Sequence, residues 1–170
     1  IKGSRIYAFE RITQLLELKI HQTVLEVNLS FVTHNLKQYQ RVLSPRTKIM
    51  AMVKALSYGA GSYEIANLLQ FHQVDYLAVA YSDEGVALRK AGIRLPIMVM
   101  NAEKNSFSAL TSYDLQPELF SFEITRAFDH FLQSEGITGF PVHIKFDTGM
   151  HRLGFAPDET EELGQLMIHT

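Results

Sequence analysis

Residues 47–66, TKIMAMVKALSYGAGSYEIA, are the stretch on which the fold prediction rests. An apolar run at 49–53 leads directly to Lys54, and a turn with Gly59 and Gly61 then leads into a segment of helical apolar spacing. A short, unbroken apolar run is typical of a buried parallel strand. The stretch therefore predicts a strand, a tight turn and a helix, with Lys54 at the carboxyl end of the strand.

The same strand-then-helix unit recurs along the rest of the chain. Further strands are predicted at residues 76–80, 97–100, 118–122 and 142–147, and the helices between them near 62–71, 82–90, 105–113 and 124–132. Pro96, Pro117 and Pro141 are expected at strand starts, where no ladder donor is lost. The alternation predicts an α/β fold with a parallel sheet, and the unit length suits a (β/α)₈ barrel, which needs about 250 residues when complete.

Helix ends and the N-terminal region give further expectations. Residues 1–20 predict a separate amphipathic helix, and 23–29, TVLEVNL, alternate apolar and polar as in a strand with one solvated face. Ser30 is expected to cap a helix that reaches Leu43, and Ser82 to cap the helix after 76–80. Asp158 and Glu161 predict a capping box for the last helix.

Composition narrows the functional classes. The 170 residues are 46% hydrophobic with a formal net charge of −2, and no Lys/Arg cluster suggests a nucleic-acid surface. The sequence contains no bilayer-length apolar segment and no signal-peptide core near its start. It has no cysteine, which excludes thiol chemistry and fits a cytoplasmic protein, and its seven histidines are scattered without metal-ligand spacing.

Two lysines are the candidate chemical groups. A lysine at a strand mouth can snorkel into water, or it can be desolvated and then attack a carbonyl as a nucleophile. Lys54 precedes its glycines, whereas a phosphate-binding P-loop places glycines before the lysine. Lys145 lies in an apolar strand and needs an anion, a neutral state or a covalent modification, with Asp147 as the simplest anion. Arg152 suits bidentate capture of a carboxylate. His143 and His151 are expected to be packing or surface residues.

Two motifs together carry a family resemblance. AMVKALSYGAGS at 51–62 and KFDTGMHRLGF at 145–155 resemble the N-terminal signatures of alanine racemase, a pyridoxal 5'-phosphate enzyme with a (β/α)₈ barrel and a separate β-domain. YLAVAYSDEGVALRKAG at 76–92 is similar to the family's next strand and helix. The resemblance implies that the chain holds five of eight barrel strands, preceded by an extra strand and helix.

The resemblance also implies roles for individual residues. Lys54 would bind pyridoxal phosphate covalently and act as the catalytic base for the α-proton of D-alanine. Tyr58 would bind the cofactor phosphate and Met100 would line the cofactor pocket. Arg152 would bind the substrate carboxylate or orient the cofactor phenolate, Met150 would lie at the substrate, and Lys145 would be a carbamylated lysine. The implied reaction interconverts L-alanine and D-alanine for peptidoglycan synthesis.

The resemblance further implies an assembly larger than this chain. The second acid/base of the family is a tyrosine of the β-domain from a dimer partner, so the isolated 170 residues are expected to be inactive and to have open sheet edges that favour association. KGSRIYAFERITQLL at 2–16 resembles the end of UDP-N-acetylmuramoyl-tripeptide–D-alanyl-D-alanine ligase. This assigns residues 1–20 to a preceding ligase domain or linker and 21–170 to the racemase barrel. The alternatives are a non-catalytic pyridoxal-phosphate regulatory protein on the same barrel and a structural module without cofactor.

Overall fold

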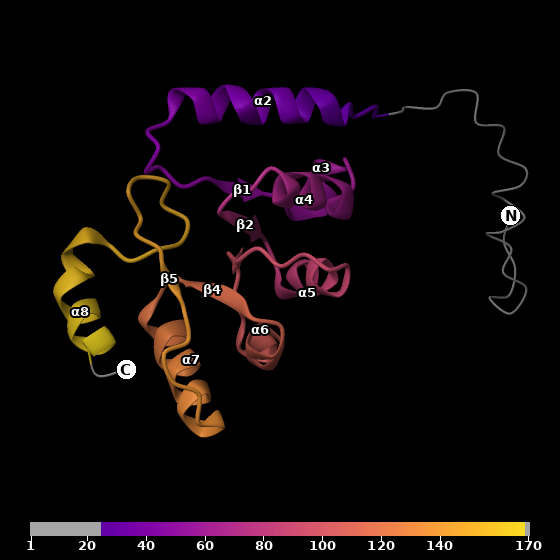
Figure 1. Ribbon diagram of the computed structural model, residues 1–170. Helices are drawn as coiled ribbons and strands as arrows, with labels where there is room; N and C mark the ends of the chain where they lie inside the picture. The colour runs from indigo at the N-terminus through magenta and orange to yellow at the C-terminus, as the bar shows by residue number, and fades with distance from the viewer. Residues whose placement is uncertain (1–24, 169–170) are drawn as a thin grey trace, which may run out of the picture.

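A curved sheet of five parallel strands organises the structure, a computed structural model that describes residues 25–168 (Figure 1). The strands are β1 (Met50–Met52), β2 (Tyr76–Val79), β3 (Ile97–Val99), β4 (Leu115–Leu119) and β5 (His143–Ile144), and their order in the sheet is their order in the chain. Each pairs in parallel with the next. This is the arrangement of a partial (β/α)₈ barrel, and the predicted fold class is confirmed.

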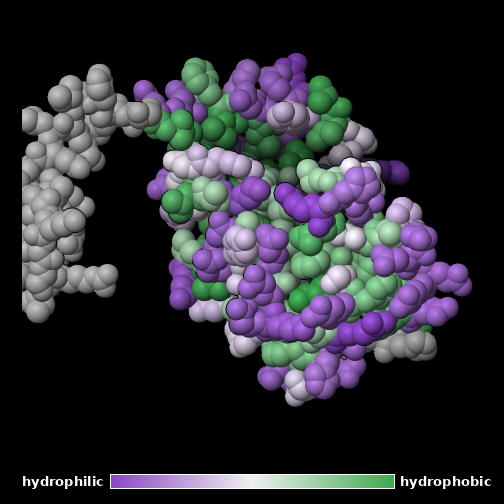
Figure 2. Space-filling model, turned by 180° about the vertical axis from the view of Figure 1, so that it is seen from behind, coloured by the Kyte–Doolittle hydropathy of each residue, from purple (hydrophilic) through white to green (hydrophobic). Residues whose placement is uncertain are grey.

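Helices connect the strands and follow one another in an arc around the sheet (Figure 1). They are α2 (Leu29–Val42), α3 (Lys54–Tyr58), α4 (Ser62–Phe71), α5 (Ser82–Lys90), α6 (Phe107–Ser112), α7 (Phe122–Glu135) and α8 (Thr160–Ile168), with 3₁₀ turns η2 (Lys104–Ser106) and η3 (Pro157–Glu159). In Figure 1, α2 lies at one end of this arc, above α4. Its exposed apolar residues include Phe31 and Val42, and apolar surface is visible along the top of Figure 2.

The two faces of the sheet differ in character. Alternate residues such as Leu77, Ile97 and Leu115 are fully buried in the core against the helices. Burial of a side chain of this size contributes about 1.5–3 kcal/mol to stability. The intervening residues include Gln116 and Glu118 of β4, which are buried but lie outside that core. The sheet therefore has an apolar outer face and a partly polar inner face.

The strand predicted at 23–29 is wrong in its described part. Residues 25–28 form no strand, and no described strand lies beside them to complete a ladder. Ser30 is not the cap of the next helix, which begins at Leu29, two residues earlier than expected. The cap is Asn28, whose side chain accepts hydrogen bonds from the amides of Ser30 and Phe31. The predicted helix and ligase-like tail at 1–20 lie outside the described residues.

Pro117 lies inside β4 and does not open it, which corrects the predicted strand start. The amide of Lys145 donates to the carbonyl of Leu119, so the backbone N–H and C=O groups of Leu119 point toward β5. The same holds for every second residue of β4 before it. Pro117 therefore faces β5 just before the pairing of Glu118 with His143 begins. Its missing N–H interrupts no ladder bond.

Two further predicted caps, Ser82 before the helix at 82–90 and Asp158 with Glu161 before the last helix, are corrected. Ser82 is the first residue of α5, and Tyr81 is the N-cap, with the carboxylate of Glu84 accepting the Tyr81 amide. Before η3 the carboxylate of Glu159 accepts the amide of Ala156. In both cases the carboxylate lies three residues after the N-cap, the spacing at which a side chain reaches back to the cap amide.

Candidate functional site

Lys54 lies two residues after Met52, the end of β1. The amide of Val53 donates to the carbonyl of Ala78 at 2.8 Å, so the ladder with β2 extends to the residue before the lysine. Lys54 is half-buried, and among residues 25–168 its side chain forms neither a hydrogen bond nor an ion pair. An amine in this position is available to a ligand at the carboxyl edge of the sheet.

The turn after Lys54 has an uncommon backbone. Ala55, Leu56, Ser57 and Tyr58 all have φ between 51° and 59°, the left-handed region, and Gly59 follows at 89°. Each non-glycine residue there costs roughly 1–2 kcal/mol. Such strain persists where the surrounding structure fixes it, and it concentrates at functional sites.

The same turn carries two hydroxyl groups with different surroundings. Ser57 is 8% exposed, and its Oγ is buried without a hydrogen-bond partner. Tyr58 is 62% exposed. An unpaired buried hydroxyl is costly. Ser57 and Tyr58 therefore carry hydroxyl groups, in the turn directly after Lys54, for which the described residues supply no hydrogen-bond partner.

The strand register relates Lys54 to the other strands. Met52 pairs with Ala78, Ala78 with Met98, and Met98 with Gln116. Lys54 lies two residues beyond Met52, and extending the register by the same two residues past the strand ends sets it level with Met100 and Glu118. Neighbouring strands are about 4.8 Å apart, so the backbones of Lys54 and Glu118 are separated by about 14 Å along the sheet. Half-buried Met100 lies between them.

Lys145 has a partner that differs from the predicted one. Its Nζ is 3.0 Å from Oε2 of Glu118 on the neighbouring strand, with the two side chains only 20% and 11% exposed. The expectation that Asp147 would be the anion is wrong. The Asp147 carboxylate accepts the amides of Gly149 and His151 and also contacts the ring of His151. These backbone bonds hold the Asp147 pKa below its ordinary value.

The loop from Asp147 to Phe155 is tied at its base. The amide of Asp147 donates to the carbonyl of Phe155, and the amide of Phe155 donates to the carbonyl of Lys145, both at 2.8 Å. Arg152 and Met150 are exposed in this loop, and neither contacts Lys54 or Lys145 through a hydrogen bond or ion pair in the described structure. The structure therefore brings Lys145 and Glu118 together but leaves Arg152 in solvent.

A second polar pair accompanies the Lys145 ion pair on the inner face. The ring of His143 is 2.9 Å from Oε1 of Gln116 and packs edge-to-face on Tyr76 of β2. Burial lowers the His143 pKa below 6.5, although the charge of Glu118 opposes this shift. Because the unfolded chain then binds the proton more tightly, His143 is expected to contribute to a loss of stability as the pH falls below about 6.5.

Loss of the Glu118 carboxylate is expected to destabilise the fold. A Glu118→Gln substitution leaves a largely buried ammonium opposite a neutral amide, and we expect the free energy of unfolding to fall by about 2 kcal/mol. Urea unfolding measures this difference. The matched control is Glu123→Gln, which breaks the Lys104–Glu123 pair, whose side chains are 60% and 79% exposed. Equal effects in the two variants would contradict a special role for the buried pair.

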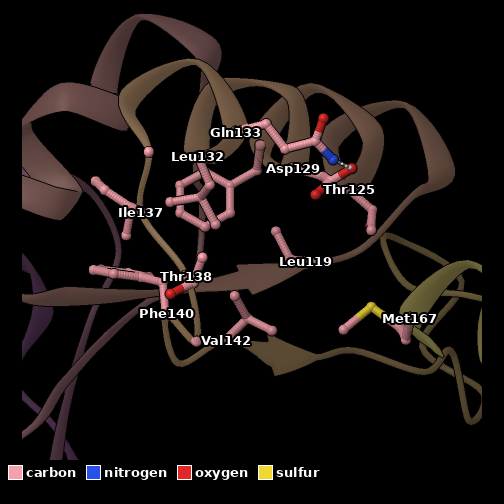
Figure 3. A pocket seen from close by; sticks show the side chains of 13 residues that line it. Leu119, Thr125, Asp129, Leu132, Gln133, Ile137, Thr138, Phe140, Val142 and Met167 are labelled. Atoms are coloured by element: carbon pink, nitrogen blue, oxygen red, sulfur yellow. Dashed lines mark hydrogen bonds between the residues drawn. The ribbon is translucent and has the colours of Figure 1, made fainter. Parts of the chain in front are cut away.

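A largely apolar, partly open pocket lies elsewhere in the molecule. It measures about 330 Å³ and is bordered by Phe128 and Leu132 of α7, Leu119 of β4, Val142 before β5 and Met167 of α8 (Figure 3). It lies against α7, and neither Lys54 nor Lys145 borders it. We therefore place the candidate site at the carboxyl edge of the strands, where the reactive groups lie.

Two negative findings apply to residues 25–168. Their His, Asp and Glu side chains form no group of three or more with the arrangement of a metal site. None of the helices in this part of the chain has the length and apolar character needed to cross a bilayer.

Comparison with known proteins gives consistent matches. Residues 27–170 match the family described as alanine racemase, N-terminal domain. An amino-acid racemase of Enterococcus faecalis is 38% identical over 144 residues, covering 82% of this chain and 19% of that protein. An alanine racemase of Methanococcus maripaludis is 36% identical over 141 residues, covering 82% of this chain and 38% of that protein. The solved alanine racemase of Clostridium difficile 630 superposes with a TM-score of 0.78 at 34% identity, covering 86% and 40% of the two chains.

Proposed function

Because the chain belongs to the family of alanine racemase N-terminal domains, we propose that it is the lysine-bearing part of an enzyme that interconverts L-alanine and D-alanine for peptidoglycan synthesis. The observation that carries the proposal is the position of Lys54. Lys54 is half-buried just beyond the carboxyl end of β1, where barrel enzymes gather their catalytic groups, and no described residue pairs with its amine.

The residues around Lys54 fit pyridoxal 5'-phosphate. Lys54 would hold the cofactor covalently, the unused hydroxyl groups of Ser57 and Tyr58 would donate to its phosphate, and Met100 would contact its ring. When bound, the cofactor withdraws electrons and so stabilises negative charge on the substrate α-carbon. Lys54 would then move the α-proton on one face, and Arg152, with Met150 beside it, would bind the substrate carboxylate.

The proposal concerns an enzyme longer than this chain. The chain spans only about a fifth to two fifths of the length of the racemases it matches. Racemisation needs a second acid/base on the opposite face of the substrate, which the resemblance assigns to a β-domain of a dimer partner. We propose that the whole protein is a cytoplasmic homodimer, with residues 1–20 from a preceding ligase segment, and that the isolated 170 residues do not racemise alanine.

The test combines covalent trapping with an activity assay. Pyridoxal phosphate is added to the 170-residue chain, the link is fixed with borohydride, and the modified lysine is mapped by peptide mass spectrometry. We expect Lys54 to be labelled in preference to exposed lysines such as Lys37, and we expect no D-alanine from L-alanine. Label spread evenly over all lysines would refute cofactor binding at this site. Specific labelling of the full-length protein without racemisation would instead identify the regulatory alternative.

Carbamylation of Lys145 remains a prediction that can be measured. The modification adds carbon dioxide to the neutral amine and releases a proton, which leaves a negative charge beside the Glu118 carboxylate 3.0 Å away. Like charges at that distance repel each other. We therefore expect the ¹³C carbamate signal, after incubation with labelled bicarbonate, to be several-fold stronger in Glu118→Gln than in the unmodified sequence. A Lys145→Arg variant is the control for signal from other lysines.

A further inference from the structure

The carboxylate of Glu84 connects the turns that follow two neighbouring strands. Its Oε1 accepts the amide of Ala55 at 2.6 Å, directly after Lys54. Its Oε2 accepts the amides of Ala80 at 2.8 Å and Tyr81 at 3.2 Å, in the turn after β2. Glu84 itself is fixed in the first turn of α5. One side chain thus binds three backbone donors from two loops.

The bond to Ala55 affects the most strained part of the backbone. Ala55 is the first of the four left-handed residues. As at the start of a helix, the left-handed turn has no internal acceptor for its first amides. The turn is closed from within by the amide of Ser57, which donates to the carbonyl of Val53. Glu84 provides the additional bond that ties the turn to the neighbouring strand segment.

We propose that Glu84 is a positioning residue for Lys54. By holding the Ala55 amide, it fixes the backbone on the carboxyl side of the lysine and so restricts where the amine can lie. This consequence for chemistry rests on the proposed function, whereas the anchoring of the turn does not. Carboxylate acceptors are about twice as strong as neutral ones, which suits a bond that offsets backbone strain.

Both oxygens of Glu84 are needed, so glutamine is not a conservative replacement. A carboxamide has a single acceptor oxygen, and its NH₂ group would face the amide of Ala55 or those of Ala80 and Tyr81. Glu84→Asp keeps the charge but is one methylene too short to reach both loops from the helix. Both variants should release one of the loops, and the matched control is Asp83→Asn. Asp83 is an exposed acid in the same helical turn, so its replacement removes the same charge without touching Ala55.

The first measurement is amide hydrogen exchange followed by ¹⁵N-resolved NMR on the 170-residue chain. In Glu84→Gln and Glu84→Asp we expect the Ala55 amide to exchange about ten to a hundred times faster, the range expected for loss of a hydrogen bond to a charged group. Exchange of core amides such as that of Leu77 should stay within about twofold. Asp83→Asn should leave Ala55 unchanged. An unchanged Ala55 exchange rate in both Glu84 variants would overturn the proposal.

The second measurement asks whether the anchored turn positions the amine. Borohydride trapping with pyridoxal phosphate is repeated, and the Lys54 label is divided by the Lys37 label in the same sample. We expect this ratio to fall at least fivefold in the Glu84 variants and to stay constant in Asp83→Asn. Global unfolding would make the labelling of all lysines equal. The urea midpoint of each variant is therefore measured as well, because a lowered midpoint identifies a variant that has lost global stability. If the unmodified chain shows no Lys54 preference, the proposed function fails, and hydrogen exchange alone decides the role of Glu84. A normal ratio in both Glu84 variants refutes positioning.

Discussion

Replacing Lys54 with alanine is expected to lower alanine racemisation by the full-length protein at least about a thousandfold. The substitution removes both the amine that would hold the cofactor and the base that would move the α-proton. The half-buried side chain has no described partner, so its removal should hardly change folding. The rate of D-alanine formation from L-alanine, followed by chiral chromatography, measures the effect.

The controls separate loss of the amine from loss of charge. Lys54→Arg keeps a positive charge but cannot form the covalent link, and it should be as inactive as Lys54→Ala. Lys37→Ala removes an exposed lysine of α2 and should retain full activity. Racemisation above a tenth of the normal rate in Lys54→Ala would disprove the catalytic role.

Gly154→Ala is expected to have the largest effect on the Asp147–Phe155 loop. Gly154 has φ of 126°, and a Cβ atom there would lie 2.6 Å from the amide nitrogen of Asp147 and 2.8 Å from the carbonyl carbon of Phe146. These are backbone atoms, so no side-chain rotation relieves the clash. We expect a loss of about 3–5 kcal/mol in the free energy of unfolding, or local opening of the loop.

Gly149→Ala is the matched control for Gly154→Ala. Gly149 has a similar φ of 132°, but a Cβ atom there would meet nothing within 4 Å. This variant isolates the backbone strain common to both positions from the steric clash. Urea unfolding measures the stability of both variants, and the amide resonances of residues 145–155 show whether the loop has opened. Equal destabilisation by the two substitutions would show that strain alone governs this loop.

The strands were predictable because their signal is local. Runs such as residues 76–80 are apolar on every residue, as a strand covered on both faces must be, and the position of Lys54 follows directly from the end of its run. The strand predicted at 142–147 is observed only as β5, so Lys145 lies directly after the strand and not within it. The strand at 23–29 was predicted wrongly. Alternating apolar and polar residues indicate that a segment suits a half-buried strand, but a strand forms only where a neighbouring strand is present to pair with it.

The partners of the site residues were not predictable in the same way. Glu118 is 27 residues from Lys145 in sequence, and only the register of β4 against β5 brings them together. One signal was present: Gln116 and Glu118 are polar residues two apart in an apolar strand, which places both on one face. The left-handed turn after Lys54 had no sequence signal, because three of its four residues are Ala, Leu and Tyr, which usually avoid positive φ. The contact of Glu84 with the Ala55 amide depends on that turn, so it could not be predicted from the sequence either.

The sequential order of the five strands has a consequence for how the chain can fold during synthesis. Each strand pairs with the one made immediately before it, so each pairing closes a loop of only one strand–helix unit. Contacts of short sequence separation form quickly, and chains are synthesised from the N-terminus at about 5–20 residues per second. Every new unit therefore has its docking partner in place when it leaves the ribosome. The sheet can grow one strand at a time, without waiting for a distant segment to arrive.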